Sequence, residues 1–384
     1  MAAPKASPQA PAFAGRMEEE RSEFLDVSCL KAGEIPGIDG MRAISVLLVM
    51  LGHYGFGRLL PGGFGVTAFF FISGFLITAL LLREASICGT ISIRNFYIRR
   101  FLRLQPELFA YVALSALLGL LYLGIPRIAD FAAAFLYVTN YYELMAKPEF
   151  DLAEVRWPQL WSLAVEEHYY LTFPLLFAAL FRSPARFVKA GIIFCAVLLV
   201  WRSLLIWSGV PGIYTYIATD CRLDSIAYGC IGALLLWHFH ATLSSLRWLR
   251  FALPLGIAVL AVSLSVRLLF IQDTVRYSVQ GIALLLIFVG LFTPLGRSAA
   301  VFLDAPALRW MGRMSYAAYL WHGEWAYAVE HVLGRELHTL GAGAMAILAA
   351  AGCAVTFAIA ALSHRFIYRR VVALRRRFGS HAAA

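Results

Sequence analysis

A basic side chain and an imidazole share one face of the first long apolar run. Arg42 and His53 are eleven residues apart. At about 100° and about 1.5 Å per residue, an α-helix returns to within roughly 20° of the same face over about 16 Å. That face would carry an arginine near its start and, further along, a histidine able to act as a general base. The alternative is a buried histidine that hydrogen-bonds to a neighbouring helix.

Two adjacent carboxylates form a second candidate group. Glu166 and Glu167 follow Trp161 and precede His168 at the start of another apolar run. Acids and a histidine in this position are hard to explain by packing alone. If they lie at the depth of His53, one carboxylate could orient the imidazole and raise its basicity. The alternative is an interfacial belt of Trp and Tyr with solvated acids.

Three arginines between the second and third apolar runs are candidates for binding phosphate. Arg99 and Arg103 are four residues apart and share a helix face, with Arg100 beside them. Planar guanidinium groups suit phosphate oxygens better than the lysine ammonium does. The alternative is an anchor on lipid headgroups at the cytoplasmic side. The absence of lysine and the interleaved aromatic residues favour phosphate.

Other polar residues within apolar runs are candidates for lining a pocket. His322 is a second histidine inside such a run and the main rival of His53 as the base. Arg222 and Asp224 could form either an internal ion pair or an edge that binds an acceptor. The pocket candidates are Ser73, Trp161, Arg222, Asp224, Tyr319 and His322.

The six cysteines lack metal-ligand spacing, and the chain has no G-x-S-x-G, H-E-x-x-H or Walker motif. Neither a bound metal nor a redox group is therefore expected.

The elements that carry these residues are apolar runs of membrane-spanning length. Of 384 residues, 61% are hydrophobic and only 15% charged, whereas a soluble domain is about half apolar and about a quarter charged. A spanning helix needs about 20 mainly apolar residues. We therefore predict an all-α polytopic membrane protein with about ten transmembrane helices and a short non-spanning helix at 131–139. The ten predicted spans are 41–58, 64–83, 107–124, 161–181, 187–208, 224–240, 251–270, 277–295, 314–333 and 341–363.

The charged residues orient these helices. Basic residues gather in alternate loops and in the tail, whereas 125–160 has five acids against three bases. Because Lys and Arg accumulate on the cytoplasmic side, both termini are expected in the cytoplasm. The net charge of +10 then reflects topology, and no nucleic-acid partner is expected. The predicted regions are a disordered cytoplasmic segment (1–35), a transmembrane domain (36–370) and a basic cytoplasmic tail (371–384).

Taken in order along the chain, these segments resemble the acyltransferase-3 family of bacterial integral-membrane acyltransferases. The shared motifs are R-x10-H, G-V-x-x-F-F-x-x-S-G-F-L-I-T, a basic R-x-x-R cluster, W-S-L-x-V-E-E, R-L-D and S-Y-x-x-Y-L-W-H. They correspond here to Arg42–His53, Gly65–Thr78, Arg99–Arg103, Trp161–Glu167, Arg222–Asp224 and Ser315–His322. Two positions depart from the pattern: Thr67 stands where an acid is common, and His168 where glutamine is usual.

The resemblance implies transfer of an acyl group, usually acetyl, from acyl-CoA to a hydroxyl of a cell-surface carbohydrate. Acyl-CoA is then a co-substrate, and no bound cofactor is implied. Together with the spacing, this predicts that His53 deprotonates the acceptor hydroxyl while Glu167 or Glu166 orients the imidazole. The predicted CoA-phosphate ligands are Arg42, Arg99, Arg100 and Arg103.

The resemblance also implies a place in the bacterial inner membrane, with membrane lipid and a carbohydrate or lipid-linked glycan as partners. The alternative function is a proton-coupled transporter or flippase of a lipid-linked saccharide. Intramembrane His and Glu residues serve equally well in a proton relay. Such a transporter would have no need to bind CoA, so binding of acyl-CoA discriminates between the two functions.

Overall fold

The computed structural model describes residues 24–33, 35–121, 124–146 and 155–371, and the secondary structure within these ranges is entirely helical. The predicted all-α fold is confirmed. The α-helices are α2 (Ser28–Ala32), α3 (Ile38–Leu51), α4 (Gly62–Cys88), α5 (Ile93–Gly119), α6 (Ile128–Phe135), α7 (Thr139–Ala146), α8 (Trp161–Leu180), α9 (Pro184–Trp207), α10 (Gly212–Ile217), α11 (Thr219–His238), α12 (His240–Ser245), α13 (Ala252–Ser265), α14 (Leu269–Asp273), α15 (Val275–Leu291), α16 (Arg297–Leu303), α17 (Pro306–Leu333) and α18 (Ala342–Ser363). Shorter 3-10 and π turns include η1 (Gly52–Phe56), η3 (Pro158–Leu160), η4 (Arg247–Phe251), η5 (Pro294–Gly296), η6 (Leu337–Thr339) and η7 (His364–Tyr368).

Each of the ten predicted spans overlaps a long helix, and the predicted short helix corresponds to α6. Among the described residues, five helices are both long and apolar enough to cross a membrane: α4, α5, α9, the η4–α13 segment and α18 with its extension to Val371. A sixth candidate is the pair Val275–Leu291 and Pro294–Leu303, which is bent by 91°. The count of ten and the placement of the termini therefore stay predictions.

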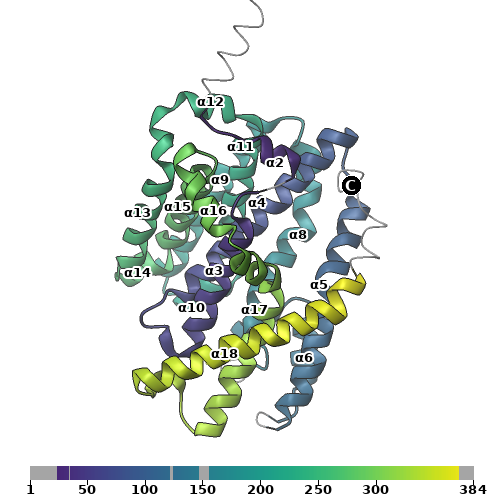
Figure 1. Ribbon diagram of the computed structural model, residues 1–384, viewed down its shortest axis with the longest axis vertical. Coiled ribbons are helices and arrows are strands. Elements are labelled where there is room, and N and C mark those ends of the chain that lie inside the picture. The colour runs from purple at the N-terminus through teal and green to yellow at the C-terminus, as the bar shows by residue number, and fades with distance from the viewer. Residues whose placement is uncertain (1–23, 34, 122–123, 147–154, 372–384) are drawn as a thin grey trace, which may run out of the picture.

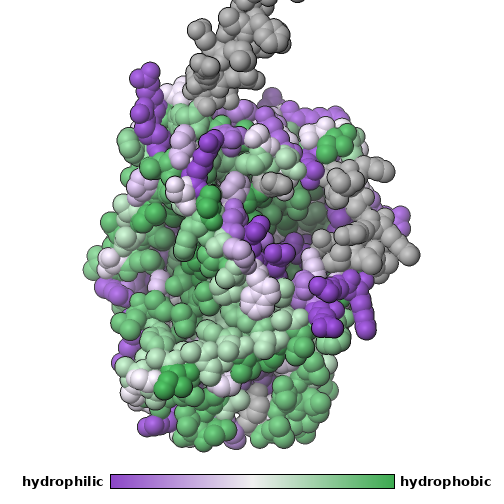
Figure 2. Space-filling model, in the orientation of Figure 1, coloured by the Kyte–Doolittle hydropathy of each residue, from purple (hydrophilic) through white to green (hydrophobic). Residues whose placement is uncertain are grey.

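Hydrophobic side chains cover much of the outside of the bundle. Figure 2 shows them spread over the side and lower part of the molecule, with hydrophilic residues concentrated toward the upper end. Large apolar residues that are more than half exposed include Leu117, Ile128 and Ile193. An apolar surface of this extent is unstable in water and matches a lipid environment. The protein is therefore a membrane protein.

The centre of the bundle is built from α3, α4, α11 and α17, while α18 crosses it obliquely (Figure 1). Glycines set the closest approaches between these helices. A Cβ atom at Gly74 of α4 would collide with the carbonyl oxygen of Ile226 on α11, and one at Gly312 of α17 with that of Asp39 on α3. The small residues of the second apolar run thus allow close helix packing.

Ordered structure begins earlier than the sequence predicts. Leu25, Val27 and Leu30 are buried in the protein interior, and the Leu25 N–H donates to Ser244 Oγ at 3.3 Å. The prediction of disorder is therefore wrong for residues 24–33, because these apolar side chains pack against the bundle. Residues 1–23 and 372–384 lie outside the described residues, so the predictions for the start of the chain and for the tail stay predictions.

Candidate active site

His53 and His322 face each other, with ring centroids 4.9 Å apart and ring planes inclined by 54°. His53 lies in η1, directly after α3, and His322 lies within α17. Their proximity follows from the packing of α3 against α17. The structure thus brings together the two histidines that were rivals in the sequence.

The π-turn η1 holds His53 in place. Gly55 within this turn has φ +99°, a left-handed conformation that favours glycine. The next side chain inward, Tyr54, donates its hydroxyl proton to the carbonyl oxygen of His322 at 3.2 Å and shares a 2.9 Å hydrogen bond with Thr356 Oγ1. The turn that carries one histidine is therefore tied directly to the backbone of the other.

Each imidazole is oriented by a backbone carbonyl of its own helix. His53 Nδ1 lies 2.9 Å from Val49 O, and His322 Nδ1 lies 2.6 Å from Tyr319 O. Because a carbonyl oxygen only accepts, each Nδ1 must carry the proton. In the neutral rings each Nε2 then keeps its lone pair, the state that a general base requires.

Both histidines line a polar cavity of about 510 Å³, which we call the histidine cavity. Its volume falls within the range of about 300–1,000 Å³ that is typical of ligand sites. The wall combines two acids with aromatic and amide side chains. Besides the histidines, the polar and aromatic lining residues are Glu143, Gln159, Trp161, Tyr216, Tyr319, Tyr327 and Glu330. Of the residues predicted to line a pocket, Trp161, Tyr319 and His322 lie in the wall of this cavity.

A second space of about 270 Å³, the outer cavity, continues from the histidine cavity. His53 and Glu330 line both, and the outer cavity adds Arg58 and His338, whose side chains are exposed. His322 lines only the inner of the two spaces. His53 is thus the imidazole nearer to the surface.

A third, narrower space of about 100 Å³, the arginine cleft, is lined by Arg42, Arg100 and Arg103. The Arg100 guanidinium lies 3.5 Å from the centroid of the Tyr170 ring. Glu166 also lines the cleft, with its Oε2 3.9 Å from Arg100 Nη2. Three arginines against one acid leave the cleft with an excess of positive charge.

The arginine cleft and the histidine cavity adjoin, because Val66 and Tyr319 line both. Tyr319 is fixed at this junction, since its hydroxyl lies 2.7 Å from Ser162 Oγ and 3.1 Å from Gln159 O. The helix face that joins Arg42 to His53 thus has the arginine cleft at one end and the two imidazoles at the other.

The paired acids are not where the sequence placed them. Glu166 accepts a 2.8 Å hydrogen bond from Ser73 Oγ and lies in the arginine cleft, where the charge of Arg100 attracts it. Glu167 lines neither the cleft nor the histidine cavity. The predicted orienting contact between these acids and His53 is therefore replaced by the Val49 carbonyl.

One of the predicted phosphate ligands has a different partner. Arg99 Nη2 lies 2.7 Å from Glu84 Oε2, and Glu84 also accepts from the Ser92 N–H at 2.9 Å. Arg99 does not line the arginine cleft. The pair instead joins the end of α4 to the start of α5.

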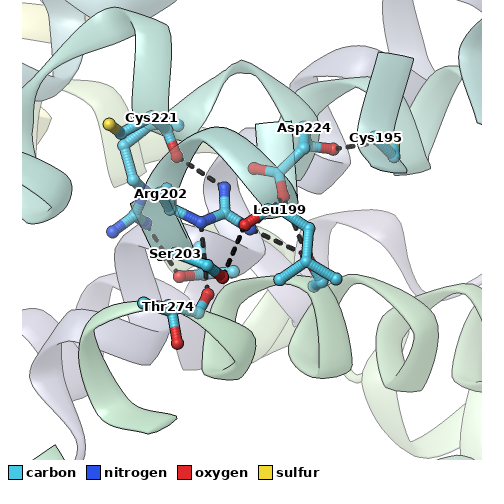
Figure 3. Close-up of polar contacts among 10 residues, drawn as sticks. Cys195, Leu199, Arg202, Ser203, Cys221, Asp224 and Thr274 are labelled. Atoms are coloured by element: carbon cyan, nitrogen blue, oxygen red, sulfur yellow. Dashed lines mark hydrogen bonds and ion pairs between the residues drawn. The ribbon is translucent and has the colours of Figure 1, made fainter. Parts of the chain in front are cut away.

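Arg222 and Asp224 are both fully buried and line none of the three cavities. Asp224 Oδ2 pairs with Arg202 Nη2 at 2.7 Å (Figure 3). Arg222 donates to Thr67 Oγ1 at 2.9 Å and lies 4.1 Å from the centroid of the Tyr277 ring. Of the two alternatives from the sequence, Asp224 forms an internal ion pair, but with Arg202 rather than Arg222.

Three residues with formal charges line these cavities and were not among the predicted site residues: Arg58, Glu143 and Glu330. Glu330 is an acid inside a predicted span, a signal that should have marked it. Arg58 is the last residue of the first predicted span and Glu143 lies between two spans, and neither belongs to a motif.

The fold and its cavities define an all-helical membrane protein with an internal polar site. The model of the acyltransferase-3 family, described as an acyltransferase domain, matches residues 35–365. The chain belongs to this family, as its motifs predicted.

Two relatives illustrate the similarity. The peptidoglycan O-acetyltransferase OatA of Listeria monocytogenes is 28% identical over 351 residues, covering 87% of this chain and 55% of that protein. The O-acetyltransferase OatA of Staphylococcus aureus is 30% identical over 302 residues, covering 75% of this chain and 50% of that protein. The chain thus spans about half the length of the curated relatives it matches. No solved structure matches the chain.

Proposed function

We propose that this protein transfers an acyl group, most simply acetyl, from acyl-CoA to a hydroxyl of a cell-envelope carbohydrate. The observation that carries the proposal is the junction of the arginine cleft with the histidine cavity at Val66 and Tyr319. It offers a path from a cationic site to two imidazoles. The relative named for peptidoglycan O-acetylation makes a peptidoglycan sugar the first acceptor to test.

In this proposal the donor binds at the arginine cleft. A space of about 100 Å³ is too small for the whole of CoA, so the nucleotide stays outside and only the end of the pantetheine arm enters the cleft. The CoA phosphates then bind Arg42, Arg100 and Arg103 at its rim, because guanidinium groups pair with phosphate oxygens. The arm points the thioester past Tyr319 toward His53. This proposal does not include Arg99 among the phosphate ligands, although the sequence predicts it as one, because Arg99 pairs with Glu84.

The histidine cavity then performs the transfer. His53 Nε2 takes the proton of the acceptor hydroxyl as its oxygen attacks the thioester carbon. The new C–O bond forms and the C–S bond breaks. The CoA sulfur takes the proton back from the imidazolium, and CoA leaves as the thiol. His53 is assigned as the base rather than His322 because, of the two histidines, only His53 lines both the histidine cavity and the outer cavity through which an acceptor would enter.

We also propose that the bundle spans the bacterial inner membrane with about ten helices and both termini in the cytoplasm. The gathering of basic residues in alternate loops, with an excess of acids in 125–160, supports this orientation. The arginine cleft then faces cytoplasmic acyl-CoA, and the outer cavity faces the cell envelope.

Binding of acetyl-CoA to the purified protein in lipid nanodiscs tests the proposal. We expect Arg100→Ala/Arg103→Ala to lose binding and His53→Ala to keep it. Arg94→Ala is the matched control, because Arg94 lies on the same helix α5 but is exposed and does not line the cleft. Folded wild-type protein that fails to bind acetyl-CoA would overturn the proposal and favour the transporter.

A further inference from the structure

Glu143 projects into the histidine cavity from α7. Glu143 is only 3% exposed. The helix beneath it is anchored, since Asn140 Nδ2 donates to Thr219 Oγ1 at 2.9 Å and Tyr141 Oη to Asp220 Oδ1 at 3.1 Å. The position of Glu143 is therefore set by contacts of α7 with the start of α11.

Both carboxyl oxygens of Glu143 are buried without a hydrogen-bond partner among the described residues. Burying a polar group without a partner is unfavourable, and such groups in folded proteins call for an explanation. Six acids are buried in the described ranges, and the other five each have a partner. These five are Glu84 (Arg99), Glu107 (Ser363), Asp130 (Arg127), Asp224 (Arg202) and Glu324 (Arg156).

The surroundings of Glu143 point to a ligand that brings hydroxyl groups. Trp161 and Tyr216 line the same cavity, with ring centroids 5.0 Å apart and planes inclined by 47°. Aromatic faces cover the C–H surface of a sugar ring, and a carboxyl group bonds to its hydroxyls. The other acid of the cavity, Glu330, is already engaged, because its Oε1 accepts from the Leu337 N–H at 3.0 Å.

We propose that Glu143 binds the acceptor sugar, hydrogen-bonding ring hydroxyls so that another hydroxyl is presented to His53. This inference rests on the proposed function, since it names the residue that selects the acceptor for that reaction. Glu143 does not contact the CoA phosphates in this scheme, because it does not line the arginine cleft.

The test compares Glu143→Ala and Glu143→Gln with the wild-type protein in nanodiscs. The probe is the peptidoglycan disaccharide of N-acetylglucosamine and N-acetylmuramic acid, with acetyl-CoA as donor. Three quantities are measured: equilibrium binding of the disaccharide alone, binding of acetyl-CoA alone, and the KM for the disaccharide in acetyl transfer. Glu107→Gln is the matched control, a buried acid that Ser363 already satisfies and that lines none of the cavities described above.

We expect Glu143→Ala to weaken disaccharide binding and raise its KM by about tenfold or more, as for the loss of one good hydrogen bond to a buried group. Acetyl-CoA binding stays at the wild-type value, and Glu143→Gln, which keeps one acceptor oxygen, lies between. Unchanged disaccharide binding in folded Glu143→Ala protein overturns the inference, as does a parallel loss of acetyl-CoA binding. Failure of wild-type protein to bind the disaccharide also overturns it, whereas failure to bind acetyl-CoA alone refutes only the proposed donor.

Discussion

The imidazole rings of His53 and His322 lie with their centroids 4.9 Å apart, each held through Nδ1 by a carbonyl oxygen of its own helix. This arrangement leaves two Nε2 atoms available in one cavity, which adjoins the arginine cleft. It also means that a backbone carbonyl, rather than a carboxylate, orients the proposed base.

Replacing His53 by alanine should abolish most of the transfer while leaving donor binding intact. A positioned general base contributes about 10²–10⁴-fold to the rate, so kcat should fall by about that factor. Initial rates of acetyl transfer and acetyl-CoA affinity are measured in the same preparation. His238→Ala is the control, since His238 is exposed at the end of α11. Normal rates in the His53 variant would assign the base to another group.

Enlarging Val66 should separate donor binding from transfer. Val66 is 5% exposed and lines both the arginine cleft and the histidine cavity, so the ring of Val66→Phe would occupy the junction. Transfer should fall by about 100-fold, as expected when a reacting group is displaced by about an ångström. Acetyl-CoA affinity and transfer rate are compared with those of Val66→Ala. A fast Val66→Phe enzyme would mean that the thioester reaches the histidines by another route.

Glu143 should make the stability of the folded protein depend on pH. Burial raises the pKa of Glu143 to about 8 from the ordinary value of 4.5. Between these two values the folded state keeps a proton that the unfolded state releases, so the free energy of unfolding falls as pH rises through this window. The expected signature is a decrease in the unfolding midpoint from pH 5 to about pH 8.

The control for this dependence is Glu143→Gln, which has no proton to lose. The other titratable groups lining the cavity are His53, His322, Glu330 and the tyrosines Tyr216, Tyr319 and Tyr327, and they are common to both proteins. The difference between the two midpoint curves therefore isolates Glu143. Parallel curves for wild type and variant would contradict the prediction.

Breaking the Arg202–Asp224 pair should destabilise the fold strongly. Arg202 is fully buried, and Figure 3 shows its guanidinium held by Asp224, Thr274 O and Cys221 O. Asp224→Asn leaves a buried positive charge without its counter-ion, which costs about 3–5 kcal/mol. Thermal unfolding in detergent measures the loss.

A surface ion pair provides the comparison. Asp26 and Arg297 are 3.6 Å apart with more than half of each side chain exposed. Asp26→Asn should change the free energy of unfolding by about 0–1 kcal/mol. Equal effects of the two substitutions would argue against a buried structural pair at Asp224.

Much of the helical framework follows from local sequence. Long apolar runs favour helices because every backbone polar group is satisfied within the segment, and each of the ten predicted ranges overlaps a helix. The Arg42–His53 spacing also predicted a shared face, and these residues line adjoining cavities. The sequence predicts disorder for the short apolar segment around Leu25, whereas this segment is buried, because its burial depends on a bundle surface that its own composition does not reveal.

The sequence by itself determined an all-helical membrane bundle, its family and the residue types available for chemistry. Only the tertiary structure decided which charges pair: Arg99 pairs with Glu84, and Asp224 pairs with Arg202. It also placed Glu166 in the arginine cleft. It alone brought Glu143 into the cavity of the histidines. The physical reason is that pairing between helices depends on their rotation and depth, which are set by the glycine-mediated contacts of α3, α4, α11 and α17. Those contacts join segments far apart in the chain, and no local periodicity encodes them.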